Sequence, residues 1–291
     1  MTLPHDFQFN QGNLQDFVDC QRRFQLRHLE RLAWPAMEAE PARDNERRLQ
    51  QGALFHRLVH QYFLGISADR LSRMDLDDEV AAWWGNFLAH GPALSGVQHP
   101  EITLSAPLAD AAGGIGYVEA AERHLIAKYD LVVRAEDGRF SIFDWKTSHR
   151  PPSRSWLQQR LQSRVYPYLL VRAGAALNEG QPIAPDQIEM VYWFAKRPDH
   201  PERFRYSQQK FNEDQAYIHR LVEQIATASL NDQPFPLVVG DKACRFCIYR
   251  SHCDRGQVAA DLADFDMDDP DGPSDSLDLS FDFENIAEID Y

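Results

Sequence analysis

The sequence lacks three features that would place it in a broad class of protein. It has no apolar run near the ~20 residues that span a bilayer, so no membrane protein is expected. Its first residues, Met-Thr-Leu-Pro-His-Asp, have neither the basic nor the apolar region of a signal peptide. Only four cysteines occur, which argues against a dense disulfide framework. These absences predict a cytoplasmic protein, and a hydrophobic content of 44% allows a sizeable globular core.

Positive charge is missing from one part of the chain. Between Asp261 and Tyr291 there are twelve acidic residues and no lysine or arginine. These twelve account for most of the net charge of −14, which leaves −2 for the first 260 residues. Acidic residues interleaved with apolar ones are typical of disordered, partner-binding segments. We therefore expect a globular body over residues 1–256 and an acidic C-terminal tail over residues 257–291, disordered or partner-binding.

Apolar spacing predicts helices first, then strands, then a closing helix. The expected helices cover about residues 13–32, 44–64, 75–89, 155–173 and 213–230, with Asn13 and Ser155 as N-caps. The expected strands lie between residues 101 and 146, with a turn at 113–116, and over 188–195 and 203–207. Trp83, Trp84 and the run Tyr192-Trp193-Phe194 are interpreted as core. This order predicts an α/β body with a helical N-terminal elaboration.

Two acidic residues and a lysine stand out in the middle of the chain. Asp130 follows the apolar run 125–129, and Asp144-Trp145-Lys146 follows the run 140–143. Carboxylates at the ends of neighbouring strands would converge on an oxygen-rich pocket for a hard divalent cation. Lys146 shares a strand face with Asp144, because side chains alternate along a strand. A metal and an ammonium group fit chemistry on a phosphodiester, whereas the alternative is a surface salt bridge at a strand end.

The four cysteines are unevenly placed. Cys244, Cys247 and Cys253 form a C-x2-C-x5-C element, and Cys20 is the only other cysteine. A C-x2-C element lets two thiolates reach one metal from a single turn. By count alone, four thiolates suit zinc and an iron–sulfur cluster equally. Shared ligation would join the first helix to the end of the body.

Basic side chains gather at three places in the sequence. Such clusters either follow a phosphate backbone or form solvated helix faces. They are Arg22, Arg23, Arg27 and Arg31; Arg47 and Arg48; and His149, Arg150, Arg154, Arg160 and Arg164.

Several motifs occur together in a characteristic order. They are Gly52-x3-His56, Asp130, Asp144-Trp145-Lys146-Thr147, Gln162-x3-Tyr166 and the four cysteines. The set resembles the RecB-like branch of the PD-(D/E)-x-K nuclease superfamily over about residues 10–256. Within that branch it is most similar to CRISPR-associated adaptation exonucleases and to the iron–sulfur nuclease domain of AddB.

This resemblance implies a fold and a set of roles. The implied fold is a mixed central sheet flanked by helices, a restriction-endonuclease-like core, with an iron–sulfur clip joining its two ends. The implied ligands of Mg2+ or Mn2+ are His56, Asp130, Asp144 and the backbone carbonyl of Trp145. Lys146 would act on the attacking water or the developing charge. Cys20, Cys244, Cys247 and Cys253 would hold a 4Fe–4S cluster in preference to Zn2+.

The helix after the second acidic motif carries two further residues of interest. Gln162 and Tyr166 are one turn apart and share a face, so they would position DNA or the catalytic lysine. The alternative is a packed helix face. Pro167 follows directly and is expected to disturb the helix, because it removes a backbone donor and clashes with the preceding turn.

The expected function is metal-dependent cleavage of DNA, single-stranded or at duplex ends. An exonuclease or end-processing enzyme in DNA repair, recombination or CRISPR adaptation is implied. No phosphate loop of the form G-x4-G-K-S/T occurs, so a helicase partner would be a separate chain. The acidic tail would bind such a partner or occupy the DNA groove as a phosphate mimic. The alternative is a non-catalytic DNA-binding subunit of a repair complex.

Overall fold

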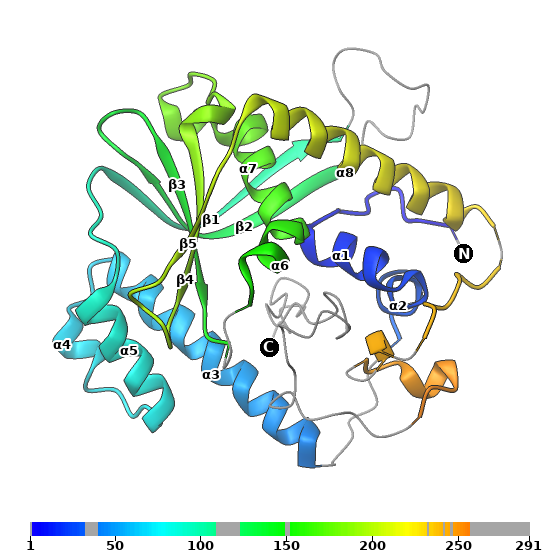
Figure 1. Cartoon of the computed structure of the whole chain (residues 1–291), viewed down its shortest axis with the longest axis horizontal. Coiled ribbons are helices and arrows are strands. Elements are labelled where there is room, and N and C mark those ends of the chain that lie inside the picture. Colours follow the sequence, from blue (N-terminus) through cyan, green and yellow to red (C-terminus); the bar gives the residue numbers. More distant parts are fainter. Residues whose placement is uncertain are drawn as a thin grey trace.

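A mixed five-stranded sheet lies at the centre of the described residues in this computed structural model (Figure 1). Its strands, in spatial order, are β1 (Val97–Pro107), β2 (His124–Arg134), β3 (Phe140–Lys146), β4 (Ile188–Phe194) and β5 (Glu202–Arg205). Strands β3 and β4 are parallel, and all other neighbours are antiparallel. The expected mixed α/β sheet flanked by helices is confirmed.

The structure describes most of the expected globular body. The described residues are 2–32, 40–108, 123–148, 152–231, 233–240, 242–244 and 247–256. The expected tail at 257–291, the turn at 113–116 and the basic residues at 149–150 lie outside them. Among the described helices, none combines the length and the apolar character that crossing a bilayer requires.

Helices cover the sheet on both faces (Figure 1). One face packs against α1 (Gln11–Asp19), α2 (Gln21–Phe24), α6 (Arg154–Gln159), α7 (Leu161–Ala173) and α8 (Gln208–Ser229). The other packs against α3 (Glu40–Phe63), α4 (Ala68–Leu71) and α5 (Asp78–His90). Short helical turns occur at Gln25–Leu29, Gly174–Asn178, Pro185–Gln187, Lys242–Cys244 and Arg250–Cys253.

The aromatic residues that the sequence assigns to the core divide between these two layers. Trp83 and Trp84 are 3% and 2% exposed, in a cluster with Phe55 and Trp193. Tyr192 lies on the opposite face of β4, in the cluster under α7. Both assignments to the core are confirmed, and no aromatic platform is formed there.

The N-terminal helix begins earlier than expected and is broken at a cysteine. Asn10, not Asn13, is the N-cap, and the two asparagines cap each other's backbone N–H groups at 2.8 and 3.0 Å. The predicted cap was therefore wrong by one turn. At Cys20 the backbone is extended, so α1 ends there and α2 starts in a new direction.

The helix expected over residues 155–173 is two helices. Ser153 caps α6, not Ser155, and an extended backbone at Arg160 separates α6 from α7. Pro167 was expected to disturb the helix, but α7 runs through it. Most residues of α7 are buried against β2, β4 and α8, so tertiary packing outweighs the one backbone hydrogen bond that proline removes.

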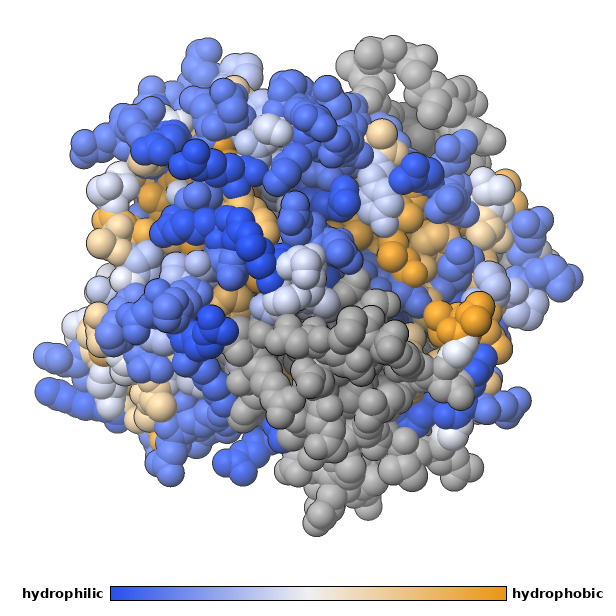
Figure 2. All heavy atoms as spheres, in the orientation of Figure 1, coloured by the Kyte–Doolittle hydropathy of each residue, from blue (hydrophilic) through white to orange (hydrophobic). Residues whose placement is uncertain are grey.

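Hydrophilic side chains cover most of the described surface on the face seen in Figure 2. Apolar side chains gather on the right side of that view, in the region of α1 and α2. Exposed apolar residues of the chain include Val18 of α1 and Leu237.

Candidate metal centre and cysteine pocket

Strand pairing brings three carboxylates into one row. Strand β2 pairs with β1 through Pro100–Leu131 and Ile102–Tyr129, so Asp130 stands opposite Glu101. It pairs with β3 through Leu131–Phe143, and one step further Asp130 stands opposite Asp144. The β1–β2 pairing is interrupted at Glu101, and the β2–β3 pairing ends at Leu131–Phe143, just before Asp130. We call Glu101, Asp130 and Asp144 the carboxylate row.

Asp130 lies at the middle of this row and is held from two sides. Its Oδ2 accepts the Trp145 backbone N–H at 2.8 Å, and its Oδ1 lies 3.2 Å from Nδ1 of His56 on α3. Asp130 was expected to end its strand, but β2 continues to Arg134. The Asp130 carboxylate accepts a backbone N–H of β3, that of Trp145, so the position of the carboxylate is set by the sheet.

Helix α3 approaches the sheet closely one turn before His56. A Cβ added to Gly52 would lie 3.1 Å from Oγ1 of Thr147. Glycine at this position therefore allows the helix to bring His56 within reach of Asp130.

Glu101 was missed by the sequence analysis. One oxygen of its carboxylate lies within 4.8 Å of a ring nitrogen of His56 and of a carboxylate oxygen of Asp130. In the described part of the chain, this is the one group of three metal-ligating side chains that lie so close together. Its φ of 49° is in the left-handed region, a strained conformation for glutamate that often marks a functional site. Lys128 lies 2.9 Å from its Oε2. No motif flags Glu101, because only the β1–β2 register places it opposite Asp130.

Lys146 lies between two partners at the other end of the row. Its Nζ is 2.9 Å from Oδ2 of Asp144 and donates to Oε1 of Gln162, also at 2.9 Å. The Gln162 amide group in turn donates to Oδ1 of Asp144. All three side chains are largely buried, with 19% of the lysine and 6% of the aspartate exposed. The sequence-predicted neighbours Asp144, Lys146 and Gln162 are thus brought together.

Tyr166 is placed differently from Gln162. Its ring is only 7% exposed and packs against Tyr129 with centroids 4.8 Å apart. The Tyr129 hydroxyl donates to the Tyr166 backbone carbonyl at 2.9 Å. In this structure the tyrosine of the Q-x3-Y pair belongs to the apolar cluster under α7.

The pKa values of His56, Asp130 and Asp144 show that negatively charged carboxylates lie close together in the site. Burial alone would lower the pKa of His56, but facing carboxylates, first Asp130, raise it to about 9. Burial alone would raise the pKa of Asp130, but His56 and the Trp145 N–H hold it below its usual value. Burial raises the pKa of Asp144 to about 6, although Lys146 acts in the opposite direction. A divalent cation would stabilise such an arrangement.

The donor set fits a hard divalent cation. Carboxylate oxygens are ligands for both Mg2+ and Mn2+, and one imidazole shifts the preference toward Mn2+. His56, Glu101 and Asp130 supply this combination, and Asp144 stands next in the row. The predicted ligand role of the Trp145 carbonyl stays a prediction.

Replacing Glu101 by glutamine should weaken Mn2+ binding by about tenfold, because one charged oxygen ligand is lost near the ion. Isothermal titration calorimetry measures this directly. Glu179→Gln is a matched control: Glu179 also has a positive φ, 54°, and also pairs with a basic side chain, Arg134. Equal affinities in the two variants would remove Glu101 from the metal centre.

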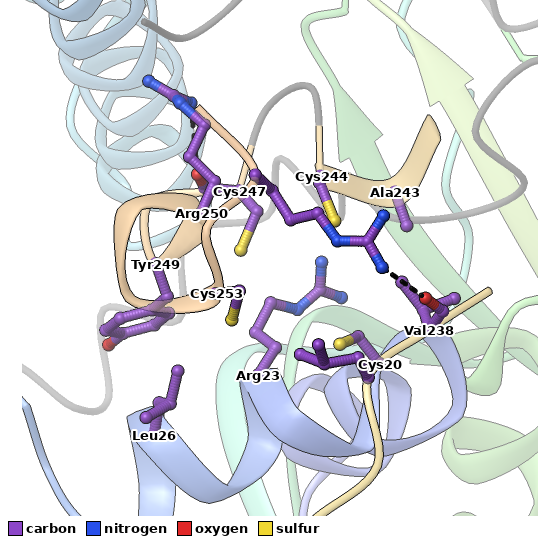
Figure 3. A pocket seen from close by; sticks show the side chains of 12 residues that line it. Cys20, Arg23, Leu26, Val238, Ala243, Cys244, Cys247, Tyr249, Arg250 and Cys253 are labelled. Carbon is purple, nitrogen blue, oxygen red and sulfur yellow. Dashed lines mark hydrogen bonds between the residues drawn. The ribbon is translucent and has the colours of Figure 1, made fainter. Parts of the chain in front are cut away.

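The four cysteines line one pocket, and Figure 3 shows their sulfur atoms turned toward a common space. Cys20 reaches it from the break between α1 and α2, and the other three from the segment 244–253. Burial raises the pKa of Cys247 and Cys253. In the described residues no three of these thiols lie within 4.8 Å of one another.

Arg23 also points into the cysteine pocket (Figure 3). Its guanidinium group contacts Asp16 at 2.8 Å and Asp19 at 2.7 Å, and all three residues are nearly buried. The positive charge of Arg23 favours the thiolate form of Cys247, against the effect of burial.

Several arginines of the sequence clusters are not free for a phosphate backbone. Arg23 and Arg160 are 8% and 3% exposed, and Arg164 pairs with Asp214 at 2.8 Å. Burial contradicts both alternatives for Arg23 and Arg160, whereas the side chain of Arg164 is 33% exposed. Arg154, by contrast, is 55% exposed and pairs with Glu202 on β5.

The chain was compared with known proteins in three ways. The comparison with curated proteins gives no match. One solved structure, titled "Crystal structure of SSO0001", is 14% identical to this chain, with 71% of this chain and 97% of that chain covered and a TM-score of 0.34. A family model described as the PD-(D/E)XK nuclease superfamily matches residues 8–254, which include both the carboxylate row and the cysteine pocket. The chain belongs to the PD-(D/E)XK nuclease superfamily.

Proposed function

We propose that this protein is a divalent-metal-dependent deoxyribonuclease of the RecB-like branch that degrades or trims DNA from ends. Superfamily membership indicates a metal-dependent nuclease. The observation that carries the proposal is the position of Lys146, whose amine is held by Asp144 and Gln162 at the end of the carboxylate row. A subunit that only binds DNA has no need of an ammonium group fixed beside Asp144 at the end of the carboxylate row.

The chemistry follows from the arrangement of these groups. Water adds to phosphorus and a P–O bond breaks, a reaction whose barrier an enzyme lowers by on the order of 20 kcal/mol. A bound divalent ion lowers the pKa of water and offsets charge on the phosphoryl oxygens. Lys146 orients the attacking water or neutralises the charge that develops in the transition state. Gln162 holds the amine, and Asp130 is fixed by the Trp145 N–H.

Assignment to the RecB-like branch rests on contacts made by its motif residues. His56 of the Gly52-x3-His56 motif contacts Asp130, and Gln162 of the Q-x3-Y motif contacts both Asp144 and Lys146. Four thiols around one pocket support the likeness to CRISPR-associated adaptation exonucleases and to AddB. A role in repair, recombination or CRISPR adaptation follows as part of the proposal.

Labelled DNA tests the proposal. Purified protein is incubated with end-labelled single-stranded, linear duplex and circular DNA, and with RNA, in Mg2+, Mn2+ or EDTA. We expect metal-dependent loss of linear DNA from its ends, with circular DNA and RNA intact. DNA that is bound but stays uncut with either ion would instead support a non-catalytic subunit.

The second part of the proposal is that Cys20, Cys244, Cys247 and Cys253 hold a 4Fe–4S cluster. A single Zn2+ with bonds of about 2.3 Å draws four thiolates close together, whereas a cluster spans a wider space. Four thiols around one pocket supply the number of ligands that such a cluster needs. Arg23 adds a positive charge beside an anionic thiolate site.

Cys253→Ser should remove the visible colour and the iron of anaerobically purified protein. The cluster joins α1 and α2 to the segment 244–253, so protease sensitivity should rise at both ends of the body together. Ser251→Ala, in the same helical turn, is the control and should keep both properties. A colourless wild-type protein containing zinc would overturn the cluster proposal.

We further propose that residues 1–256 form the nuclease unit and that the acidic tail at 257–291 acts outside it, on a partner or on the DNA-binding surface. Truncation after Gly256 should raise DNA affinity at low salt, because twelve carboxylates no longer compete with phosphates. Fluorescence anisotropy at several salt concentrations measures this. Unchanged affinity would leave partner binding, for example to a helicase chain, as the role of the tail.

A further inference from the structure

Helix α7 carries Gln162 at its second position but has no N-terminal cap of its own. The residue at its N-cap position, Arg160, makes no side-chain cap hydrogen bond. The first helical N–H, that of Leu161, instead donates to Oε1 of Gln15 on α1 at 3.0 Å. Gln15 and Leu161 are 4% and 1% exposed, so water does not supply this bond. Gln15 therefore caps α7 from 146 residues away.

The Gln15 side chain is itself held on its other side. Its amide nitrogen donates to Oδ1 of Asp19 at 2.8 Å, and Oδ2 of Asp19 accepts from Arg23 at 2.7 Å. Arg23 lines the cysteine pocket, and Cys20 follows Asp19 in the chain. A continuous series of contacts thus runs from the cysteine pocket through Asp19 and Gln15 to the first turn of α7.

The residue after the capped N–H is the one that holds the lysine. Gln162 accepts from Lys146 and donates to Asp144, so its amide fixes two groups of the site at once. A displacement of the first turn of α7 would move both hydrogen bonds together. Small displacements of such groups have large effects on rate.

We propose that Gln15 is a positioning residue that caps α7 and thereby holds Gln162 against Lys146 and Asp144. This rests on the proposed function only for its effect on cleavage, because the cap itself is a contact of the fold. Through Asp19 and Arg23, the same side chain couples the cysteine pocket to the carboxylate row.

Gln15→Met tests this role, because methionine keeps the length of the side chain but cannot accept from Leu161. Gln25→Met is a matched control. Gln25 is 8% exposed, and its Oε1 also accepts a backbone N–H from far along the chain, that of Phe235 at 2.7 Å. The described contacts of its side chain include none to α7.

Two measurements on the full-length protein separate the cap from its effect on cleavage. Hydrogen exchange of the Leu161 amide should become about fivefold faster in Gln15→Met, as for loss of a helix cap, and stay unchanged in Gln25→Met. The kcat for DNA cleavage should fall about tenfold in Gln15→Met, with KM unchanged.

A double-mutant cycle with Gln162→Met then identifies the route. If Gln15 acts through Gln162, the double variant should cleave no more slowly than Gln162→Met alone, whereas Gln25→Met should combine multiplicatively. Unchanged Leu161 exchange in Gln15→Met would overturn the cap. Faster exchange with normal kcat, or multiplicative loss with Gln162→Met, would overturn the positioning role. Absence of cleavage by the wild type would overturn the proposed function. Hydrogen exchange of the Leu161 amide would then still show whether Gln15 caps α7.

Discussion

Lys146→Met is expected to lower metal-dependent DNA cleavage by on the order of a thousandfold, the scale for removing a group that stabilises transition-state charge. Methionine preserves most of the buried side-chain volume, so the fold should survive. Affinity for Mn2+ should be retained or increase, because a positive charge near Asp144 is removed. Single-turnover cleavage and calorimetric titration with Mn2+ measure the two effects separately.

Lys210→Met is the matched control for this substitution. Lys210 lies in the first turn of α8 and contacts the Arg205 carbonyl, outside the carboxylate row. Its replacement should leave cleavage unchanged. If Lys146→Met cleaves at the wild-type rate, Lys146 has no part in the chemistry; if it loses Mn2+ binding, its role is structural.

Asp16→Ala is expected to destabilise the protein by about 3–5 kcal/mol, because it removes the carboxylate that the buried side chains of Arg23 and His28 share. Asp16 is 7% exposed and contacts Arg23, Arg27 and His28 at 2.8, 3.3 and 2.9 Å. Urea denaturation of wild type and variant measures the difference. Asp137→Ala is the control. Asp137 also pairs with an arginine, at 2.7 Å, but both partners are exposed, so the change in the free energy of unfolding should be within experimental error.

The same aspartate predicts a dependence of stability on pH. Burial alone would raise the pKa of Asp16, but its three basic neighbours hold it well below the usual 3.8. A carboxylate with a lowered pKa in the folded state stabilises it fully above 3.8, and this contribution is lost as the pH falls further. The stability difference between wild type and Asp16→Ala should therefore shrink in acid. A constant difference down to pH 2 would contradict this assignment.

Local patterns in the sequence were sufficient for the elements and for most of the site. The apolar run 140–143 predicts β3, and the helical repeat predicts α3, α5 and α8, because that periodicity reports one buried face of a helix. Residues two positions apart on a strand share a face, so Asp144 and Lys146 could be paired from spacing alone. Gln162 could be linked to them only through a motif, and its contacts agree with that motif.

Ends of elements were predicted less well than their interiors. Asn13 and Ser155 were chosen as caps, whereas Asn10 and Ser153 have this role, because several residues nearby have suitable side chains. The chain continues helically through Pro167 since burial of α7 stabilises it more than one lost hydrogen bond costs. Local preference is weak where tertiary packing competes with it.

The sequence by itself determined which chemical groups are present: an acidic pair with a lysine at strand spacing, a histidine one turn after a glycine, and four unevenly spaced cysteines. What only the tertiary structure decided is which distant groups complete the site. Glu101 joins the row through strand register, and Gln15 reaches Leu161 across 146 residues. Spacing along the chain encodes which face a side chain occupies. It does not encode which strand or helix packs against that face, because this depends on the free energy of the whole core.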